Sequence, residues 1–180
     1  MQGMMKHRPV QIADILDYAA EIFPKTEIVS VRTEGDVHRT TYLETSKRVA
    51  QMAHALGALG VQPGDRVATL AWNGYRHFEI YYGVSGMGAV CHTINPRLPA
   101  EQMSYILNHA QDRVLFVDLS LIGLVEALKG DVPDGMKIVV MTDRAHMPDT
   151  SLDVLCYDCP LYPSDPADDP HYVTPKVPRR

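Results

Sequence analysis

The sequence lacks several features that would assign it to a common class of protein. Its three cysteines are too few for a disulfide framework. It has no lysine- or arginine-rich block, and its net charge of -5 gives no electrostatic support for a nucleic-acid partner. No apolar run approaches the roughly 20 residues of a transmembrane helix, and residues 1–23 lack the apolar centre of a signal peptide. We therefore expect a cytoplasmic chain with reduced cysteines and no transmembrane segment.

Motifs for binding phosphate groups are also missing. The sequence contains no G-x-x-x-x-G-K-[ST] loop, and its last glycine is Gly135. The stretch Gly83–Gly88 (GVSGMG) resembles a dinucleotide-binding fingerprint read backwards, but it closes a predicted helix instead of opening one. We interpret it as a helix end at which Gly86 and Gly88 pack closely against a neighbouring element.

The patterns that are present predict an α/β fold. An apolar stripe predicts a helix over 12–23, and β-branched residues predict a hairpin of strands 27–32 and 37–41. Thr41 and Glu44 form a capping-box pattern that opens the next helix. Short apolar strands at 66–71, 89–94, 113–117 and 137–142 then alternate with helices at 74–87, 100–110 and 120–129. This alternation indicates right-handed crossovers and a mostly parallel sheet.

Cys91 and His92 stand side by side and raise the possibility of a catalytic pair, a metal site or a piece of scaffold. Neighbouring residues of a strand point to opposite faces, whereas a nucleophile and its base must lie within about 3 Å. We therefore expect Cys91 to behave as a small buried hydrophobic residue. His92 is expected at the strand end, hydrogen-bonded to backbone.

Two further groups could in principle bind a metal. Cys156 and Cys159 form a C-x-x-C motif, but no second ligand pair follows at zinc-finger spacing and no helix begins there, so we interpret the motif as chance. His77, His92 and His109 lie on separate predicted elements, and we expect them to be surface or capping residues instead of a metal site.

The end of the sequence differs in composition from the rest. Residues 159–180 carry six of the 13 prolines and no glycine. Proline at this density is incompatible with helix interiors and sheet ladders. We predict a proline-rich, disordered tail there.

Several stretches resemble a known family. The most specific are Pro63–Val67 (PGDRV), Trp72–Gly74 (WNG), Gly86–Leu98 (GMGAVCHTINPRL) and Met141–Pro148 (MTDRAHMP). Together they resemble the N-terminal part of acyl-CoA synthetases in the adenylate-forming, AMP-binding superfamily. Long-chain and medium-chain fatty-acid CoA ligases and methylthiopropionate CoA ligases look most similar. The resemblance covers about Arg8 to Asp158.

The resemblance implies a fold and a reaction. Residues 1–158 would form the N-terminal portion of the large domain, a mostly parallel sheet with flanking helices plus an N-terminal helix and hairpin, and 159–180 would be a divergent tail. Family members convert a carboxylic acid, ATP and coenzyme A into acyl-CoA, AMP and diphosphate, with Mg²⁺. Their phosphate loop and catalytic lysine follow the matched region. The resemblance thus implies a truncated ligase, inactive alone, in lipid metabolism.

The same resemblance assigns no catalytic, cofactor-binding or metal residue to this sequence. We therefore expect neither ATP, Mg²⁺ nor CoA to be bound by this chain by itself. The alternative to a truncated enzyme is a non-catalytic binding or dimerising fragment. Such a fragment would form a homo-dimer or associate with a full-length synthetase.

Overall fold

The N-terminal third of the protein forms a helix, a hairpin and a second helix. The computed structural model describes residues 11–128 and 130–159, so the predicted tail lies outside the described residues except for Cys159. The first elements are α1 (Ala13–Ile22), β1 (Glu27–Val31), β2 (Val37–Thr41) and α2 (Tyr42–Ala58). The strands pair antiparallel. At the start of α2, the backbone N–H of Glu44 donates to the Thr41 side chain while the Glu44 carboxylate accepts from the Thr41 backbone, which confirms the capping box.

The remaining elements alternate between strand and helix as the apolar pattern predicts. They are β3 (Arg66–Leu70), α3 (Tyr75–Gly86), β4 (Val90–Thr93), α4 (Ala100–Ala110), β5 (Val114–Asp118), η1 (Leu119–Leu121), α5 (Ile122–Glu126), β6 (Lys137–Met141), η2 (Arg144–His146) and β7 (Val154–Cys156). Two details differ from the prediction. The helix expected over 120–129 is reduced to a 3₁₀ turn followed by the five-residue α5, and the three-residue strand β7 was not predicted.

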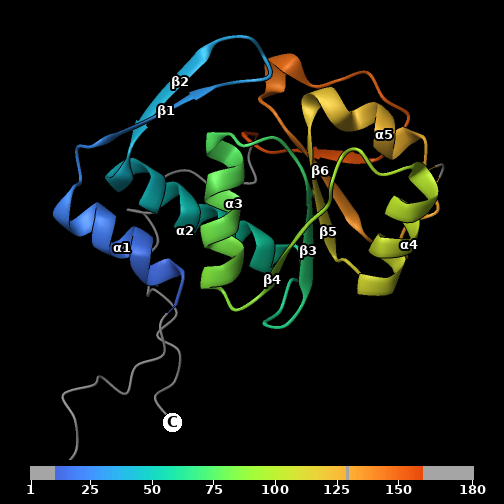
Figure 1. The fold of residues 1–180 in the computed structure, drawn as a ribbon, viewed down its shortest axis with the longest axis horizontal. Helices are drawn as coiled ribbons and strands as arrows, with labels where there is room; N and C mark the ends of the chain where they lie inside the picture. Colours follow the sequence, from blue (N-terminus) through green and yellow to red (C-terminus); the bar gives the residue numbers. More distant parts are fainter. Residues whose placement is uncertain (1–10, 129, 160–180) are drawn as a thin grey trace, which may run out of the picture.

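The five strands β3 to β7 form one parallel sheet in the order β4-β3-β5-β6-β7. Helices cover both faces: α2 and α3 lie on one side, while α4 and α5 lie on the other (Figure 1). The chain first winds outward from β3 to β4 and then returns past β3 to β5. The strand order therefore reverses between β3 and β5, as in doubly wound folds.

Two apolar layers hold the helices to the sheet. Alternate residues of β5 point to opposite faces, so Val114 and Phe116 join the α2/α3 layer while Leu115 and Val117 join the α4/α5 layer. All five residues of β5 are buried, as expected for the central strand of a covered parallel sheet.

Helices α2 and α3 pack closely because Gly83 lies at their contact. A Cβ atom at Gly83 would collide with the terminal methyl group of Met52 and would lie 3.2 Å from the carbonyl oxygen of Val49. The glycine of the GVSGMG stretch with the tightest surroundings is therefore Gly83. Gly88 supplies the helix end, with a φ of 84°, which confirms helix termination as the role of this stretch.

The α1 helix, the residues flanking it and the hairpin expose several large apolar side chains. Those that are at least half exposed are Ile12, Ile15, Tyr18, Ile22, Phe23, Val29, Val31 and Val37. Val29, Val31 and Val37 lie on one face of the hairpin, because Val31 pairs with Val37 and Val29 with Arg39. Within the described residues, no helix has both the length and the apolar character needed to cross a membrane.

Candidate functional site

A network of buried charged side chains joins α2, α3 and the residues just after β7. Its centre is Glu79, whose side chain is fully buried. The Glu79 carboxylate accepts hydrogen bonds from Arg48 Nε at 2.6 Å and Arg48 Nη2 at 3.1 Å, and from the Tyr157 hydroxyl at 2.8 Å. Burial raises the pKa of Glu79, although Arg48 and Tyr157 both favour the charged form. Glu79 thus fastens α3 to α2 and to the end of the sheet.

Arg76, one helical turn before Glu79, forms the second centre. Its Nε and Nη2 donate to Asp158 at 2.9 and 2.7 Å, and its Nη1 donates to the Met141 carbonyl oxygen at 2.9 Å. The same Nη1 lies 2.8 Å from Glu34 Oε1. Burial opposes ionisation of Arg76, but Asp158 and its other partners outweigh this effect and raise its pKa. Arg76 therefore links the hairpin and β6 to Asp158, which follows β7.

Asp158 and Tyr75 complete the network. Arg48 Nη2 donates to Asp158 Oδ1 at 2.8 Å, and the Tyr75 hydroxyl donates to Oδ2 at 3.2 Å. Both guanidinium groups also lie over the Tyr75 ring, at 4.9 Å for Arg76 and 5.7 Å for Arg48. Burial is the main cause that raises the pKa of Tyr75. Two arginines, Arg48 and Arg76, are thus ion-paired with the three carboxylates of Glu34, Glu79 and Asp158 in the first half of α3 and beside it.

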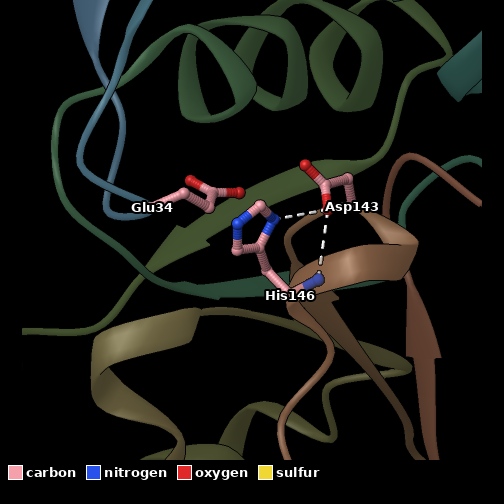
Figure 2. A group of neighbouring side chains, drawn as sticks. All are labelled: Glu34, Asp143 and His146. Carbon is pink, nitrogen blue, oxygen red and sulfur yellow. Dashed lines mark hydrogen bonds and ion pairs between the residues drawn. The ribbon is translucent and has the colours of Figure 1, made fainter.

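Glu34, Asp143 and His146 form the one group of potential metal ligands found among the described residues. One ligand atom from each lies within 4.8 Å of the others. Glu34 comes from the hairpin tip, whereas Asp143 and His146 come from the segment after β6 (Figure 2). Asp143 Oδ1 lies 2.7 Å from His146 Nδ1 and caps η2 by accepting from the backbone N–H of Ala145 and His146.

The arginines beside this group argue against a divalent cation there. Arg76 lies 2.8 Å from Glu34, and Arg32 Nη1 lies 3.3 Å from Asp143. A metal ion would have to displace these two guanidinium groups or sit beside them against charge repulsion. The hydrogen bond from His146 holds the pKa of Asp143 below its usual value. The group is best described as an ion-paired anchor that fastens the hairpin tip to the sheet.

The three histidines considered as metal ligands do not form a potential metal-ligand group among the described residues. His77 Nε2 lies 3.0 Å from Thr69 Oγ1, and His109 stacks on Tyr105. His92 Nδ1 lies 2.8 Å from Asp112 Oδ2. The prediction that His92 bonds to backbone is therefore wrong: the buried carboxylate at the end of α4 is its partner. Cys91 is half-buried, and burial raises the pKa of its thiol to about 11, consistent with an unreactive scaffold residue.

Cys156 and Cys159 depart from the prediction. They are joined by a disulfide, with their Cα atoms 5.2 Å apart, so the expectation of reduced cysteines and a chance motif is wrong for this pair. The reason lies in the turn after β7: this strand pairs with β6 up to Cys156, and the chain then turns tightly enough to bring Cys159 back.

Sequence patterns did contain a signal for the network. Arg76, Glu79, Ile80, Gly83 and Val84 recur at helical spacing, and all are buried on one face of α3. Two charged residues on an otherwise apolar stripe indicate buried ion pairs. The partner of Arg76, Asp158, lies 82 positions away in the sequence, so no local pattern could identify it.

Acid should destabilise the protein partly through His77. Burial lowers the pKa of His77, and also that of His38, below the usual value. A folded state that binds a proton less readily than the unfolded chain has its full stability above the unfolded pKa of about 6.5 and loses it as the pH falls. We expect His77→Gln, which keeps a partner for Thr69, to flatten the fall in unfolding free energy between about pH 7.5 and about pH 5.5.

Urea titrations of both proteins at each pH would measure this difference. Burial raises the pKa of Asp118, which favours folding at lower pH and so acts in the opposite sense. The difference between variant and parent, not the parent profile alone, therefore reports on His77. Parallel pH profiles for the two proteins would contradict the assignment.

Comparison with known proteins agrees with the resemblance seen in the sequence. A model of the family described as AMP-binding enzyme matches residues 16–174. The chain is 50% identical over 144 residues to a 3-methylmercaptopropionyl-CoA ligase of Ruegeria lacuscaerulensis, covering 80% of this chain and 27% of that protein. It is 48% identical over 141 residues to a long-chain-fatty-acid–CoA ligase of Thermus thermophilus, covering 78% and 26%.

A solved structure shows the same relationship. The N-terminal domain of FACL13 from Mycobacterium tuberculosis superposes with a TM-score of 0.64 at 29% identity, covering 72% of this chain and 33% of that one. The chain spans about a quarter of the length of the curated relatives that it matches. It belongs to the AMP-binding enzyme family, as a segment homologous to the N-terminal region of acyl-CoA ligases.

Proposed function

We propose that the chain is the N-terminal part of an ATP-dependent acyl-CoA ligase. In the reaction that the whole protein would catalyse, a carboxylate and ATP give an acyl-adenylate and diphosphate, and coenzyme A then displaces AMP to form a thioester. The observation that carries the proposal is the identity of 50% and 48% to two proteins named as CoA ligases. A fatty acid or a related short carboxylic acid is the substrate class that these names suggest.

The buried network of ion pairs suggests a structural role for this chain within the whole ligase. Arg48, Arg76 and Glu79 fix the end of β7 against α2 and α3. The carboxyl ends of β3, β5 and β6 lie at the same edge, which is where open α/β sheets bind ligands. In the proposed ligase, this segment supplies a rigid support, while ATP, Mg²⁺ and CoA are bound mainly by parts of the protein outside the matched region.

We also propose that the 180-residue chain does not form an adenylate by itself. The sequence has no glycine-rich phosphate loop. The carboxylates of Glu34 and Asp143 are already ion-paired with Arg76 and Arg32. Charge that develops on the phosphates in the transition state would then meet no arranged set of donors.

Isotope exchange between ATP and diphosphate tests this prediction. We expect the purified chain, with ATP, Mg²⁺ and a fatty acid, to exchange at the rate of the buffer blank. A full-length relative assayed beside it serves as the positive control. Exchange by the isolated chain at a rate comparable to that relative would contradict the proposal.

A binding role is the second candidate, and the exposed apolar side chains favour it. Ile15, Tyr18 and Ile22 on α1, and Val31 and Val37 on the hairpin, are at least half exposed. Such a surface is typical of a protein-binding site. The chain would then form a homo-dimer or associate with a full-length synthetase. Sedimentation velocity of the chain alone and mixed with such a synthetase distinguishes these two outcomes from a purely monomeric chain.

A further inference from the structure

The Cys156–Cys159 disulfide encloses two residues of the buried network. The residues between the cysteines are Tyr157, which is 1% exposed and donates to Glu79, and Asp158, which accepts from Arg48 and Arg76. Their backbone N–H groups also donate, to the carbonyl oxygens of Val140 and Thr142. The disulfide therefore closes around the point where the end of β7 is fastened to α2 and α3.

The surroundings of the two sulfur atoms suit both redox states. Cys156 is buried, and its Sγ lies 3.4 Å from the carbonyl oxygen of Thr142, which would accept from the thiol in the reduced state. Cys159 is less buried than Cys156, so its sulfur is the expected site of attack by a small thiol. Attack on Cys159 makes Cys156 the leaving sulfur.

We propose that Cys156 and Cys159 form a redox-active pair that exchanges with low-molecular-weight thiols and controls how firmly Tyr157 and Asp158 are held in the network. The oxidised pair restricts the turn and keeps both side chains on their partners. The reduced pair leaves the turn held by hydrogen bonds and ion pairs alone. This property is independent of the proposed ligase function.

The chemical step is thiol–disulfide exchange. A glutathione thiolate attacks Sγ of Cys159, the S–S bond breaks, and Cys156 leaves as a thiolate that takes up a proton. A second glutathione thiolate attacks the glutathione sulfur of the mixed disulfide and releases Cys159 as a thiolate, which is also protonated. Two glutathione molecules thus supply two electrons and two protons and become oxidised glutathione.

Cys91 provides an internal reference for this reactivity. Burial raises the pKa of its thiol to about 11, so little thiolate is present at neutral pH. Mass spectrometry of alkylated peptides separates Cys91 from the pair. We expect Cys91 to be alkylated slowly whatever the glutathione ratio, whereas the pair should change between a disulfide and two alkylated cysteines.

Coupling between the disulfide and the network must be reciprocal. If the disulfide favours the conformation in which Asp158 is bonded to Arg48 and Arg76, then removing those bonds must shift the thiol–disulfide equilibrium toward the dithiol by the same factor. A disulfide that only happens to form near the network would show no such dependence. The equilibrium constant with glutathione therefore separates the proposal from a purely structural cross-link.

The experiment measures that equilibrium constant for the full chain, for Asp158→Asn and for Asp153→Asn. Asp153 is exposed and precedes β7, so it is the matched control. We expect Asp158→Asn to shift the equilibrium toward the dithiol by on the order of tenfold, comparable to the entropic effect of closing a four-residue loop, and Asp153→Asn to leave it unchanged. Amide hydrogen exchange at Tyr157 and Asp158 should quicken on reduction by a similar factor.

Two results would overturn the proposal. One is the absence of the disulfide at every ratio of oxidised to reduced glutathione in the parent chain. The other is an equal equilibrium constant for Asp158→Asn and Asp153→Asn. If Asp158→Asn does not fold, Tyr157→Phe, which removes only the hydroxyl bonded to Glu79, takes its place with the same expected direction.

Discussion

Replacing Arg76 by methionine should lower the free energy of unfolding by about 3–5 kcal/mol, the usual cost of removing one partner of a buried ion pair. Methionine fills a similar volume but leaves Glu34 and Asp158 without their shared guanidinium group, and these side chains are 1% and 18% exposed. The carbonyl oxygen of Met141 also loses a donor. Urea unfolding followed by circular dichroism measures the change.

The matched control is Arg39→Met. Arg39 pairs with Glu27 on the hairpin at 2.8 Å, but the two side chains are 60% and 55% exposed. Exposed pairs contribute at most about 1 kcal/mol, so this variant should unfold close to the parent. Equal losses of unfolding free energy for Arg76→Met and Arg39→Met would contradict the prediction that the buried ion pairs of Arg76 stabilise the fold more than an exposed pair does.

Replacing Phe116 by alanine should cost about 3–5 kcal/mol. Phe116 lies in the central strand β5, is 2% exposed and packs edge-to-face on Tyr157 with ring centroids 5.9 Å apart. The cavity would open beneath α3, because neighbouring strands on both sides prevent β5 from moving to fill it. Chemical denaturation of the variant gives the loss directly.

Tyr105→Ala serves as the control for Phe116→Ala. Tyr105 is 67% exposed on α4, and substitutions at such positions usually change stability by less than about 0.5 kcal/mol. A loss below about 1 kcal/mol for Phe116→Ala would mean that the layer between the sheet and α2/α3 is not close-packed as described.

Apolar periodicity was enough to predict most of the fold. Strands β3, β5 and β6 are short apolar runs bounded by turn residues, and their predicted limits differ from the observed ones by one residue at most. The Thr41/Glu44 capping-box pattern predicted the start of α2 correctly, because the two side chains accept hydrogen bonds from backbone N–H groups that the first helical turn leaves without partners. Strand β7 escaped prediction because three residues are too few to show alternation, and its pairing with β6 is a tertiary contact.

The network shows why a site is harder to predict than a fold. Arg76 and Glu79 could be recognised as charged residues on an apolar stripe, but Glu34, Asp158 and Tyr157 reach them from distant parts of the sequence. The same limit applies to His92, whose partner Asp112 is 20 residues away. The Cys156–Cys159 pair depended on the unpredicted strand β7, so its closure could not be foreseen either.

A chimeric ligase tests most directly whether this chain is the N-terminal part of an acyl-CoA ligase. The matching 141-residue segment of the Thermus thermophilus long-chain-fatty-acid–CoA ligase, 48% identical to this chain, would be replaced by the corresponding residues of this chain. Acyl-CoA formation from ATP, CoA and a fatty acid is then measured. Because buried positions should match, we expect a folded chimera that forms acyl-CoA at a readily measured rate, whereas the isolated chain should form none. A folded chimera without activity would contradict the proposal that this chain is the N-terminal part of an acyl-CoA ligase.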